Sequence, residues 1–446
     1  MVASSRRKAG GAGMRMKALS SLLLLGSLSF GQTGQTNSTA PSSIKLTVAD
    51  AEQMALKNNP QISIAKLLAL AQRQVTREVR SNAMPTATLN VTAVDSHEGS
   101  RITAGGLNNP VIYERAAAGV NLSQLIYDFG RMHNLVASAK YREEAEVASQ
   151  QATTADITFA VDRAFYNALD AQSTLDVAKE TVSARQATAD QIQALTNAKL
   201  KSQLDLSFAN VNLAQAKLLL LDAENRQAAS FANLNNLLGF EKQQPYLLVD
   251  ELATPPAPAT NAEDLTAAAF QSRPDLIALN DRYQAAERFR RAEHDLNRPT
   301  ISALAAFGDT PVRADQLTPW YGAAGVNLSL PVFNGFLYSA RAKQADFEAK
   351  AAQEQVRDLR DRIARDVQTT WLQSTTSYQR MAVAQQLVQQ ANLALDLAQT
   401  RYKLGLSSIV ELSQAQLAQT QAAIGNADAQ YEYESTLAAL RYQTGK

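Results

Sequence analysis

The side chains that could carry catalysis or metal binding are few and scattered in this sequence. Its 446 residues include no cysteine, which excludes disulfides, thiolate metal sites, cysteine nucleophiles and iron–sulfur clusters. The histidines His97, His133 and His294 lie too far apart for a metal-ligand motif. The glycine-rich stretches at residues 10–13 and 105–106 fall in a leader region and a predicted hairpin, so neither is a nucleotide-binding loop. We therefore expect neither an enzyme nor a cofactor-binding protein.

Charge and hydropathy narrow the class of protein further. The chain carries 43 Lys and Arg residues against 42 Asp and Glu, a net charge of +1, so no basic field indicates a nucleic-acid partner. No apolar run approaches the roughly 20 residues that a membrane-spanning helix needs, which argues against a helical membrane bundle. The absence of cysteine also excludes the lipid anchor of bacterial lipoproteins. A membrane role would have to rest on β-strands.

The longest apolar run, Ala18–Phe30, is typical of a secretory signal peptide. It is 13 residues long, which is too short for a membrane span, and the basic residues Arg15 and Lys17 precede it. We therefore predict a signal peptide over residues 1–31 and a flexible leader over residues 32–46. The mature protein is expected to work outside the cytoplasm.

An internal repeat organises the rest of the chain. The segment Ala117–Ser123 recurs letter for letter as Ala323–Ser329, an offset of 206 residues, and the same offset carries Gly239 onto Gly445. A proline-rich stretch separates the two copies. The predicted organisation is a first repeat over residues 47–245, a linker over 246–264 and a second repeat over 265–446.

Each repeat is predicted to contain two short helices, two strands and one long helical hairpin. In the strands the hydrophobic period is two, so that Leu89 and Val91 flank the polar Asn90. Residues 132–197 contain no proline or glycine, and small and apolar residues recur there in threes and fours, which is typical of a coiled coil about 100 Å long. The strands are expected at about residues 85–96, 115–127, 299–309 and 321–333, and the hairpins at 132–239 and 337–445.

The predicted strands pose a closure problem if they lie in a membrane. A sheet in lipid has to pair all its backbone groups, so it must close on itself, and bacterial barrels have at least about eight strands. Several copies of a four-stranded chain would then share one barrel: two copies would leave little bore, whereas three would supply twelve strands. The alternative is a soluble β-hairpin whose apolar face packs on the helices.

Four segments carry a resemblance to a known family. They are the openings Ala51–Pro60 (AEQMALKNNP) and Phe270–Leu276 (FQSRPDL), the segment Leu328–Gly335 (LSLPVFNG) after the fourth strand, and Arg401–Leu406 (RYKLGL). Their order makes the sequence resemble the TolC-type outer-membrane efflux family from Leu46 to Gly445. The resemblance implies a mainly α fold with a small β part: a homotrimer whose twelve-stranded outer-membrane β-barrel continues into a twelve-helix periplasmic α-barrel.

The same resemblance implies a passive exit duct of a tripartite efflux or type I secretion system. Its partners would be a periplasmic adaptor protein, an inner-membrane pump and the lipid of the bacterial outer membrane, and it would need no cofactor. In the family an apolar–Gly–Leu pattern at the two helical turns contacts the adaptor; here Lys199 replaces the glycine of the first turn. The implied docking residues are Lys199, Leu200, Lys201, Leu404, Gly405 and Leu406.

The resemblance also implies a gate beside these turns. Asp205 and Glu411 would form an acidic ring that holds cations, weakened because Gln414 replaces an acidic residue of the family's best-known member. Tyr402 matches the tyrosine that helps to hold the mouth shut. Ser407 stands where that member has an arginine, which excludes a salt bridge through this position. We expect the closed state to rely instead on packing and hydrogen bonds of Tyr402.

The same residues also fit plainer roles. Tyr402 suits the flank of a coiled coil, and Asp205 and Glu411 suit the first turn of a helix, where the helix dipole favours a carboxylate. Lys199 and Lys201 would keep an exposed turn soluble. For the whole chain, the alternative is an exported structural coiled-coil protein without channel activity.

Overall fold

The structure, a computed structural model, describes residues 44–95, 97, 115–242, 244, 246–250, 256–309 and 318–445. The predicted signal peptide, most of the predicted leader and the glycines at 105–106 lie outside these residues. The described part is mainly helical with a small β part, as predicted, and within it no helix is both long and apolar enough to cross a membrane. In chain order the elements are β1 (Ile44–Leu46), α1 (Val48–Asn58), α2 (Pro60–Ser81), β2 (Thr86–Val94), β3 (Arg115–Tyr127), α3 (Arg131–Asn197), α4 (Gln203–Leu237), β4 (Tyr246–Leu248), α5 (Ala262–Ser272), α6 (Pro274–His294), the 3-10 turn η1 (Asp295–Asn297), β5 (Thr300–Asp309), β6 (Trp320–Ser329), α7 (Leu337–Lys403) and α8 (Ile409–Gln443).

The helical hairpins of the two repeats match residue by residue. The long helices α3 and α7 contain 67 residues each, and the return helices α4 and α8 contain 35 each. Both helices of the second hairpin begin and end 206 residues after their counterparts, which agrees with the offset in the sequence. Among the short helices, α1 ends at Asn58 and α2 begins at Pro60, because proline disfavours a helical conformation in the residue before it.

Four antiparallel strands form one sheet in the order β2-β3-β5-β6. Residues paired directly across neighbouring strands share a face, so the register gathers Leu89, Val120 and Phe307 on one apolar face. The other face carries Thr, Asn, Ser and Gly residues, among them Asn90 and Asn121. The predicted alternation is therefore confirmed. In the described part of the chain, the outer edges of β2 and β6 have no partner strand.

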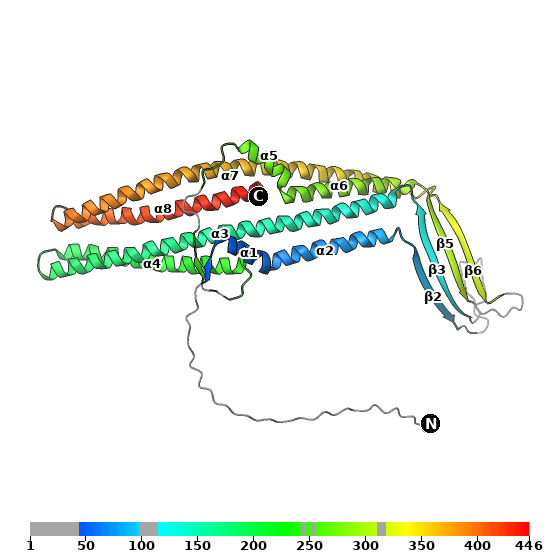
Figure 1. Cartoon of the computed structure of the whole chain (residues 1–446), viewed down its shortest axis with the longest axis horizontal. Helices are drawn as coiled ribbons and strands as arrows, with labels where there is room; N and C mark the ends of the chain where they lie inside the picture. The colour runs from blue at the N-terminus through cyan, green and yellow to red at the C-terminus, as the bar shows by residue number, and fades with distance from the viewer. Residues whose placement is uncertain are drawn as a thin grey trace, which may run out of the picture. The chain divides into compact units, whose positions relative to one another are not determined.

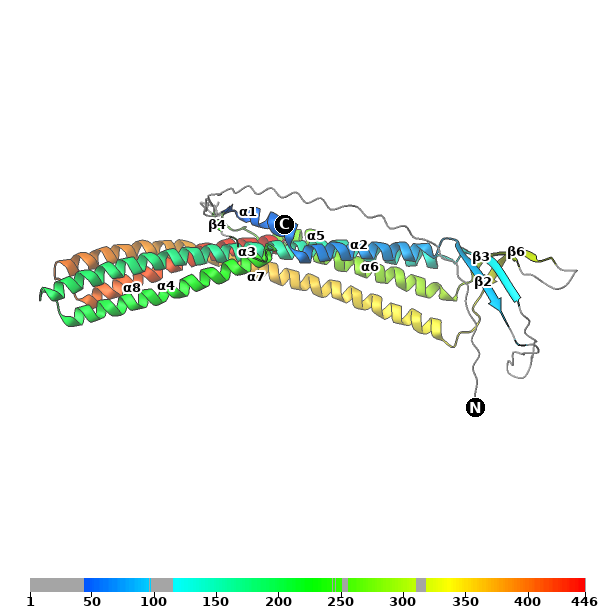
Figure 2. The ribbon, with the colours of Figure 1, turned by 90° about the horizontal axis from the view of Figure 1, so that it is seen from below.

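The helix α3 lies in the middle of the helical layer. It packs against α4 and α8 along one part of its length and against α2 and α6 along the other, whereas α7 packs against α8, α6 and α5. Figures 1 and 2 show the strands at one end of α3 and α7 and the α3–α4 and α7–α8 turns at the other. Near these turns the order across the layer is α4–α3–α8–α7, so α4 and α7 are its outermost helices.

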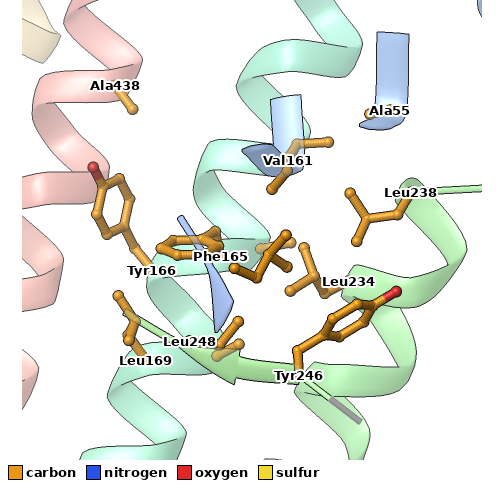
Figure 3. Close-up of a cluster of buried hydrophobic side chains, with 14 of the residues drawn as sticks. Ala55, Val161, Phe165, Tyr166, Leu169, Leu234, Leu238, Tyr246, Leu248 and Ala438 are labelled. Atoms are coloured by element: carbon orange, nitrogen blue, oxygen red, sulfur yellow. The ribbon is translucent and has the colours of Figure 1, made fainter. Parts of the chain in front are cut away.

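The largest hydrophobic core lies where α1, α4 and β4 pack on the middle of α3 (Figure 3). Val161 and Phe165 of α3 are buried there with Leu234 of α4 and Leu248 of β4. Full burial of side chains of this size contributes about 1.5–3 kcal/mol each. This core fixes the short elements of the first repeat against the long helix.

Two segments predicted to be irregular contain structure at their ends. The predicted leader over residues 32–46 ends in β1, and the predicted linker over residues 246–264 begins with β4; the two strands pair in parallel. Leu46 and Leu248 are buried in the core, which explains why so short a pair persists. The linker also ends early, because the Asn261 side chain accepts a bond from the Glu263 amide and starts α5.

The fourth strand is shorter than the predicted range of 321–333. It ends at Ser329, and Pro331 follows, which has no N–H to donate to a strand ladder. The segment that follows carries exposed aromatic side chains, Phe333 and Phe336, whose rings pack edge to face at 5.8 Å between centroids. The strand therefore gives way to an aromatic junction before α7 begins.

Candidate functional site

The α3–α4 and α7–α8 turns have the same backbone geometry. In both, the amide two residues beyond the helix cap donates to a carbonyl of the last turn at 2.8 Å, from Leu200 in the first and Leu406 in the second. This bond is characteristic of the Schellman motif, which ends a helix with one residue in the left-handed conformation. Lys199, with φ 61°, and Gly405, with φ 73°, occupy that position.

Both turns present leucine side chains to solvent. Leu200 is 71% exposed, Leu404 68% and Leu406 66%. Lys199 is exposed beside them. The three leucines among the predicted docking residues therefore expose apolar side chains at the hairpin tips, and exposed apolar surface of this kind is typical of protein contact sites.

Asp205 and Glu411 lie in the first turns of α4 and α8. The Asp205 carboxylate accepts from the Ser202 amide at 3.2 Å while the Asp205 amide donates to the Ser202 hydroxyl at 3.1 Å, which makes a capping box. The Glu411 amide donates to the Ser408 hydroxyl at 3.3 Å, and its carboxylate lies 3.4 Å from the Arg401 guanidinium. Both carboxylates thus have partners within one copy of the chain.

Tyr402 lies in a buried cluster between the two hairpins. Ile192 of α3 and Leu206 of α4 belong to the same cluster, and the Lys201 ammonium lies 4.1 Å from the centre of the Tyr402 ring. Burial is the main cause that raises the pKa of the Tyr402 hydroxyl. This hydroxyl has no hydrogen-bond partner in the described part of the chain. Within one copy, therefore, the Tyr402 ring is packed, and its part in a gate stays a prediction.

Among the other predicted gate residues, Asp205 lies close enough to this tyrosine for its charge to add to the rise in the Tyr402 pKa. Ser407 is half-buried and its hydroxyl lacks a partner among the residues that the structure describes, while Gln414 is exposed on α8. The side chain of Lys201, which is also a predicted docking residue, lies over the Tyr402 ring. The structure therefore brings Tyr402 together with Lys201 and Asp205, whereas Glu411 pairs with Arg401.

Sequence reasoning missed a buried arginine on α3. Arg185 donates to the Thr420 hydroxyl of α8 at 3.3 Å, and that hydroxyl lies 3.4 Å from the hydroxyl of Thr181. Burial lowers the pKa of Arg185 to about 10, which leaves it charged at neutral pH. A signal was available, because Arg185 takes the seam position between Val182 and Ala189, where the pattern calls for a small or apolar residue.

Three buried carboxyl groups farther along the α3–α8 contact were also missed. Burial raises the pKa of Asp162 to about 7, that of Asp170 to about 6 and that of Glu434 to about 7. Neighbouring acids add to the first two shifts, Glu52 beside Asp162 and Asp428 beside Asp170, and each pair can share one proton. Since α3 and α8 belong to different repeats, these groups bear on how the repeats pack together.

The tips offer contact surface and a packed tyrosine. In the ranges that the structure describes, no group of three or more histidine, aspartate or glutamate side chains could hold a metal ion. This region therefore combines exposed leucine side chains, capped helix starts and a buried tyrosine ring that packs between two hairpins.

The sequence matches the model of a known protein family. Residues 52–240 and 265–446, which lie within the two predicted repeats, match the outer membrane efflux protein family. The outer membrane protein TolC of Vibrio cholerae is 25% identical over 423 residues, covering 89% of this chain and 90% of that protein. The TolC protein of Escherichia coli K12 is 23% identical over 398 residues, covering 85% and 78%.

Solved structures of outer-membrane channels share the fold. The outer-membrane channel OprN superposes with a TM-score of 0.80 at 19% identity, covering 89% of each chain. The outer membrane protein VceC of Vibrio cholerae gives a TM-score of 0.77 at 18% identity, covering 89% of this chain and 96% of that one.

Proposed function

The chain belongs to the outer membrane efflux protein family, located in the outer membrane, and on this premise we propose that three copies form one passive duct. Twelve strands would close a barrel in the outer membrane, and twelve helices would continue it into the periplasm. The duct serves as the last step of a tripartite efflux or type I secretion system. A periplasmic adaptor and an inner-membrane pump open it and supply the energy, so the chain itself performs no catalysis.

The proposal rests on one observation. The first repeat contacts the second through α3 and α8, whereas the equivalent surfaces on α7 and α4 have no such contact within the described part of one copy. Within the copy α3 packs on α8, with the Thr181 and Thr420 hydroxyls 3.4 Å apart. The offset of 206 residues relates Thr181 to Leu387 on α7, and Thr420 to Ala214 on α4. Leu387 is 56% exposed, and Ala214 is exposed as well. A neighbouring copy whose α4 packs on α7, as α8 packs on α3, would bury both.

The sheet has the same asymmetry. Inside one copy the pairing of β3 with β5 joins the repeats, which leaves β2 of the first repeat and β6 of the second as edges. Pairing β6 with β2 of the next copy would satisfy the edge groups, which lipid cannot do. A head-to-tail contact of this kind closes into a ring when the rotation permits. Three copies of a four-stranded sheet give twelve strands, within the range of outer-membrane barrels.

The side chains of the sheet support a lipid-facing exterior. Leu89 and Val91 point outward from the apolar face and are exposed in the single copy. Trp320 begins β6 at the end of the sheet away from the helices, and Tyr127 and Phe129 pack at 4.7 Å between ring centroids at the helical end. Outer-membrane barrels carry aromatic girdles at both membrane interfaces, and these residues are placed to supply them.

At the other end of the helices we assign the mouth of the duct to the two turns. Leu200 and Leu406 give adaptor hairpins an apolar surface, and Tyr402 keeps neighbouring hairpins together in the closed state. Asp205 and Glu411 contribute negative charge around the opening in addition to capping their helices, and their three copies disfavour anions. The exposed Gln414 adds no charge to this ring.

The arrangement can be tested with cysteines, because the natural chain has none. Leu387→Cys combined with Ala214→Cys is expected to give covalent trimers after oxidation in the outer-membrane fraction, and each single variant is expected to give none. Purified trimers should conduct ions across a planar lipid bilayer. A protein that is released by periplasmic extraction as a monomer, without cross-links or conductance, would instead be the exported coiled-coil rod.

A further inference from the structure

A row of four residues crosses the sheet near the end that lies away from the helices. Asn90 of β2 pairs with Gly119 of β3, Gly119 pairs with Gly308 of β5, and Gly308 pairs with Tyr321 of β6. Directly paired residues point to the same side of a sheet, so all four lie on the polar face. Two adjacent glycines in such a row leave a strip of backbone without side chains.

The Tyr321 side chain lies over this strip. A Cβ atom added at Gly308 would be 2.6 Å from the Tyr321 hydroxyl oxygen and 2.7 Å from the ring carbon that bears it. A Cβ atom at Gly119 would also overlap that hydroxyl. Side chains on a strand ordinarily stand roughly perpendicular to the sheet, so this ring departs from the usual direction and lies against the backbone. Neither glycine has a positive φ, so the backbone conformation does not call for glycine at these positions.

The internal repeat provides a control for this interpretation. Gly325 is the counterpart of Gly119 within the seven-residue segment that both repeats share letter for letter. It lies on the same polar face, yet a Cβ atom added there would meet no atom of the described residues within 4 Å. The two glycines have the same neighbours in sequence and differ in what lies over them. The covering ring is therefore specific to Gly119 and Gly308, which we call the glycine seat.

We propose that the glycine seat holds Tyr321 flat against the wall of the duct and so sets the width of its outer opening. This inference rests on the proposed function, in which the polar face lines the lumen and three copies meet around it. Without the seat, each of three tyrosine rings would take the ordinary upright direction and project into the bore. Passage of bulky solutes would then fall, because access through a pore depends on its diameter.

A single introduced cysteine can report the width of the opening. Asn121 lies on the polar face two residues beyond Gly119 on the side of the helices, so a reagent from outside must pass Tyr321 to reach it. Cells that produce Asn121→Cys are treated with a small maleimide and, separately, with a maleimide–polyethylene glycol too large for porins. We expect Gly119→Ala to slow labelling by the bulky reagent at least about fivefold while labelling by the small reagent is unchanged.

The controls separate the seat from a general effect of alanine. Gly325→Ala should label like the parent with both reagents. Adding Tyr321→Phe to Gly119→Ala removes the overlapping hydroxyl oxygen and should restore bulky labelling, and Tyr321→Ala should restore it fully. Gly308 is left unchanged, because a Cβ atom there would also lie 2.5 Å from the Ala118 carbonyl oxygen.

Each outcome decides one question. The proposal for the glycine seat is wrong if Gly119→Ala does not slow labelling by the bulky reagent. It is also wrong if Gly325→Ala slows that labelling equally, or if adding Tyr321→Ala to Gly119→Ala does not restore it. If Gly119→Ala forms no heat-modifiable trimers, adding Tyr321→Phe to it is expected to restore them. Failure to restore the trimers would also contradict the proposal for the glycine seat. If even the small reagent does not label Asn121→Cys in the parent, the polar face does not line a water-filled lumen, and the proposed function fails instead.

Discussion

The two long hairpins share their length and register but differ in what surrounds them. In α3, 21 residues are buried, against 11 in the equally long α7. The reason is position: α3 packs against five helices, α1, α2, α4, α6 and α8, whereas α7 packs mainly against α5, α6 and α8 in the described part of the chain. A duplicated sequence thus serves two environments, one inside the copy and one at its edge. The difference locates the contacts that a second copy has to supply.

The largest expected effect comes from placing a charge on the edge helix. Leu387→Glu puts a carboxylate where we expect α4 of the neighbouring copy, and an uncompensated buried charge costs about 3–5 kcal/mol at each contact. Heat-modifiable trimers should be lost on gel electrophoresis of outer-membrane extracts. Gln386→Glu, at the exposed residue next to it, is the matched control and should assemble normally. Trimers of normal stability in Leu387→Glu would show that α7 is not an interface.

The next effect concerns Tyr402, whose counterpart in the first repeat is Thr196. Tyr402→Ala empties part of a buried cluster, which costs about 3–5 kcal/mol for a large aromatic residue, and single-channel conductance should rise because the hairpins separate more easily. Tyr402→Phe should leave conductance unchanged, since the hydroxyl has no partner in the described part of the chain. Thr196→Ala, at the equivalent place, should also have no effect. Unchanged conductance in Tyr402→Ala would remove this residue from the gate.

The sequence predicted those features that follow from local rules. The hairpin lengths follow from the absence of proline and glycine and from a continuous seam, and the strand faces follow from a period of two. The helix-capping role of Asp205 could have been predicted from Ser202 three residues earlier, since this spacing is that of a capping box.

Features that depend on distant partners could not be predicted in the same way. The pairing of β1 with β4 joins residues about 200 positions apart, and a strand of three residues is too short for its sequence to indicate which strand it pairs with. Lys199 has a left-handed φ because the turn requires it, although its residue type argues against it. The cover over Gly119 is a further case, because the same seven letters occur in the second repeat without it.

The acids of the α3–α8 contact predict a dependence of stability on pH. Asp162 has a folded pKa of about 7 against an ordinary value of 3.8, so between about pH 4 and 7 the folded state holds a proton that the unfolded state has lost. The free energy of unfolding should therefore fall as the pH rises through this window, by roughly 1–3 kcal/mol. Asp162→Asn removes this contribution, so its melting temperature should decline less between pH 5 and pH 8.

The second repeat provides the comparison for this prediction. The counterpart of Asp162 on α7 is Gln368, which does not titrate, so the effect belongs to the contact inside the copy and not to the edge. Asp176→Asn, at an exposed position of α3, should keep the full decline in melting temperature. An equal decline in Asp162→Asn and in the parent protein would mean that this carboxyl group is already ionised in the folded chain.

The smallest effect distinguishes the two turns. Lys199 and Gly405 hold the same left-handed position, which costs a residue with a side chain about 1–2 kcal/mol and costs glycine little. Lys199→Gly should therefore stabilise the first hairpin by about 0.5 kcal/mol, less than the strain alone because glycine also gives the unfolded chain more freedom. Gly405→Ala should destabilise the second by about 1 kcal/mol.

Both changes can be followed by the melting temperature of the purified trimer and by the rate at which a protease cleaves each turn. Gly425→Ala is the informative control, because Gly425 lies inside α8 without a positive φ and with open space around its Cβ position. Alanine there should stabilise the helix by about 0.5–1 kcal/mol. If Gly405→Ala lowers the melting temperature and Gly425→Ala raises it, the loss of stability at the turn comes from the backbone conformation that Gly405 adopts. If both variants change the melting temperature in the same direction, the left-handed conformation does not explain the difference between the two turns. Lys199 in the first turn would then be no more strained than Gly405 in the second.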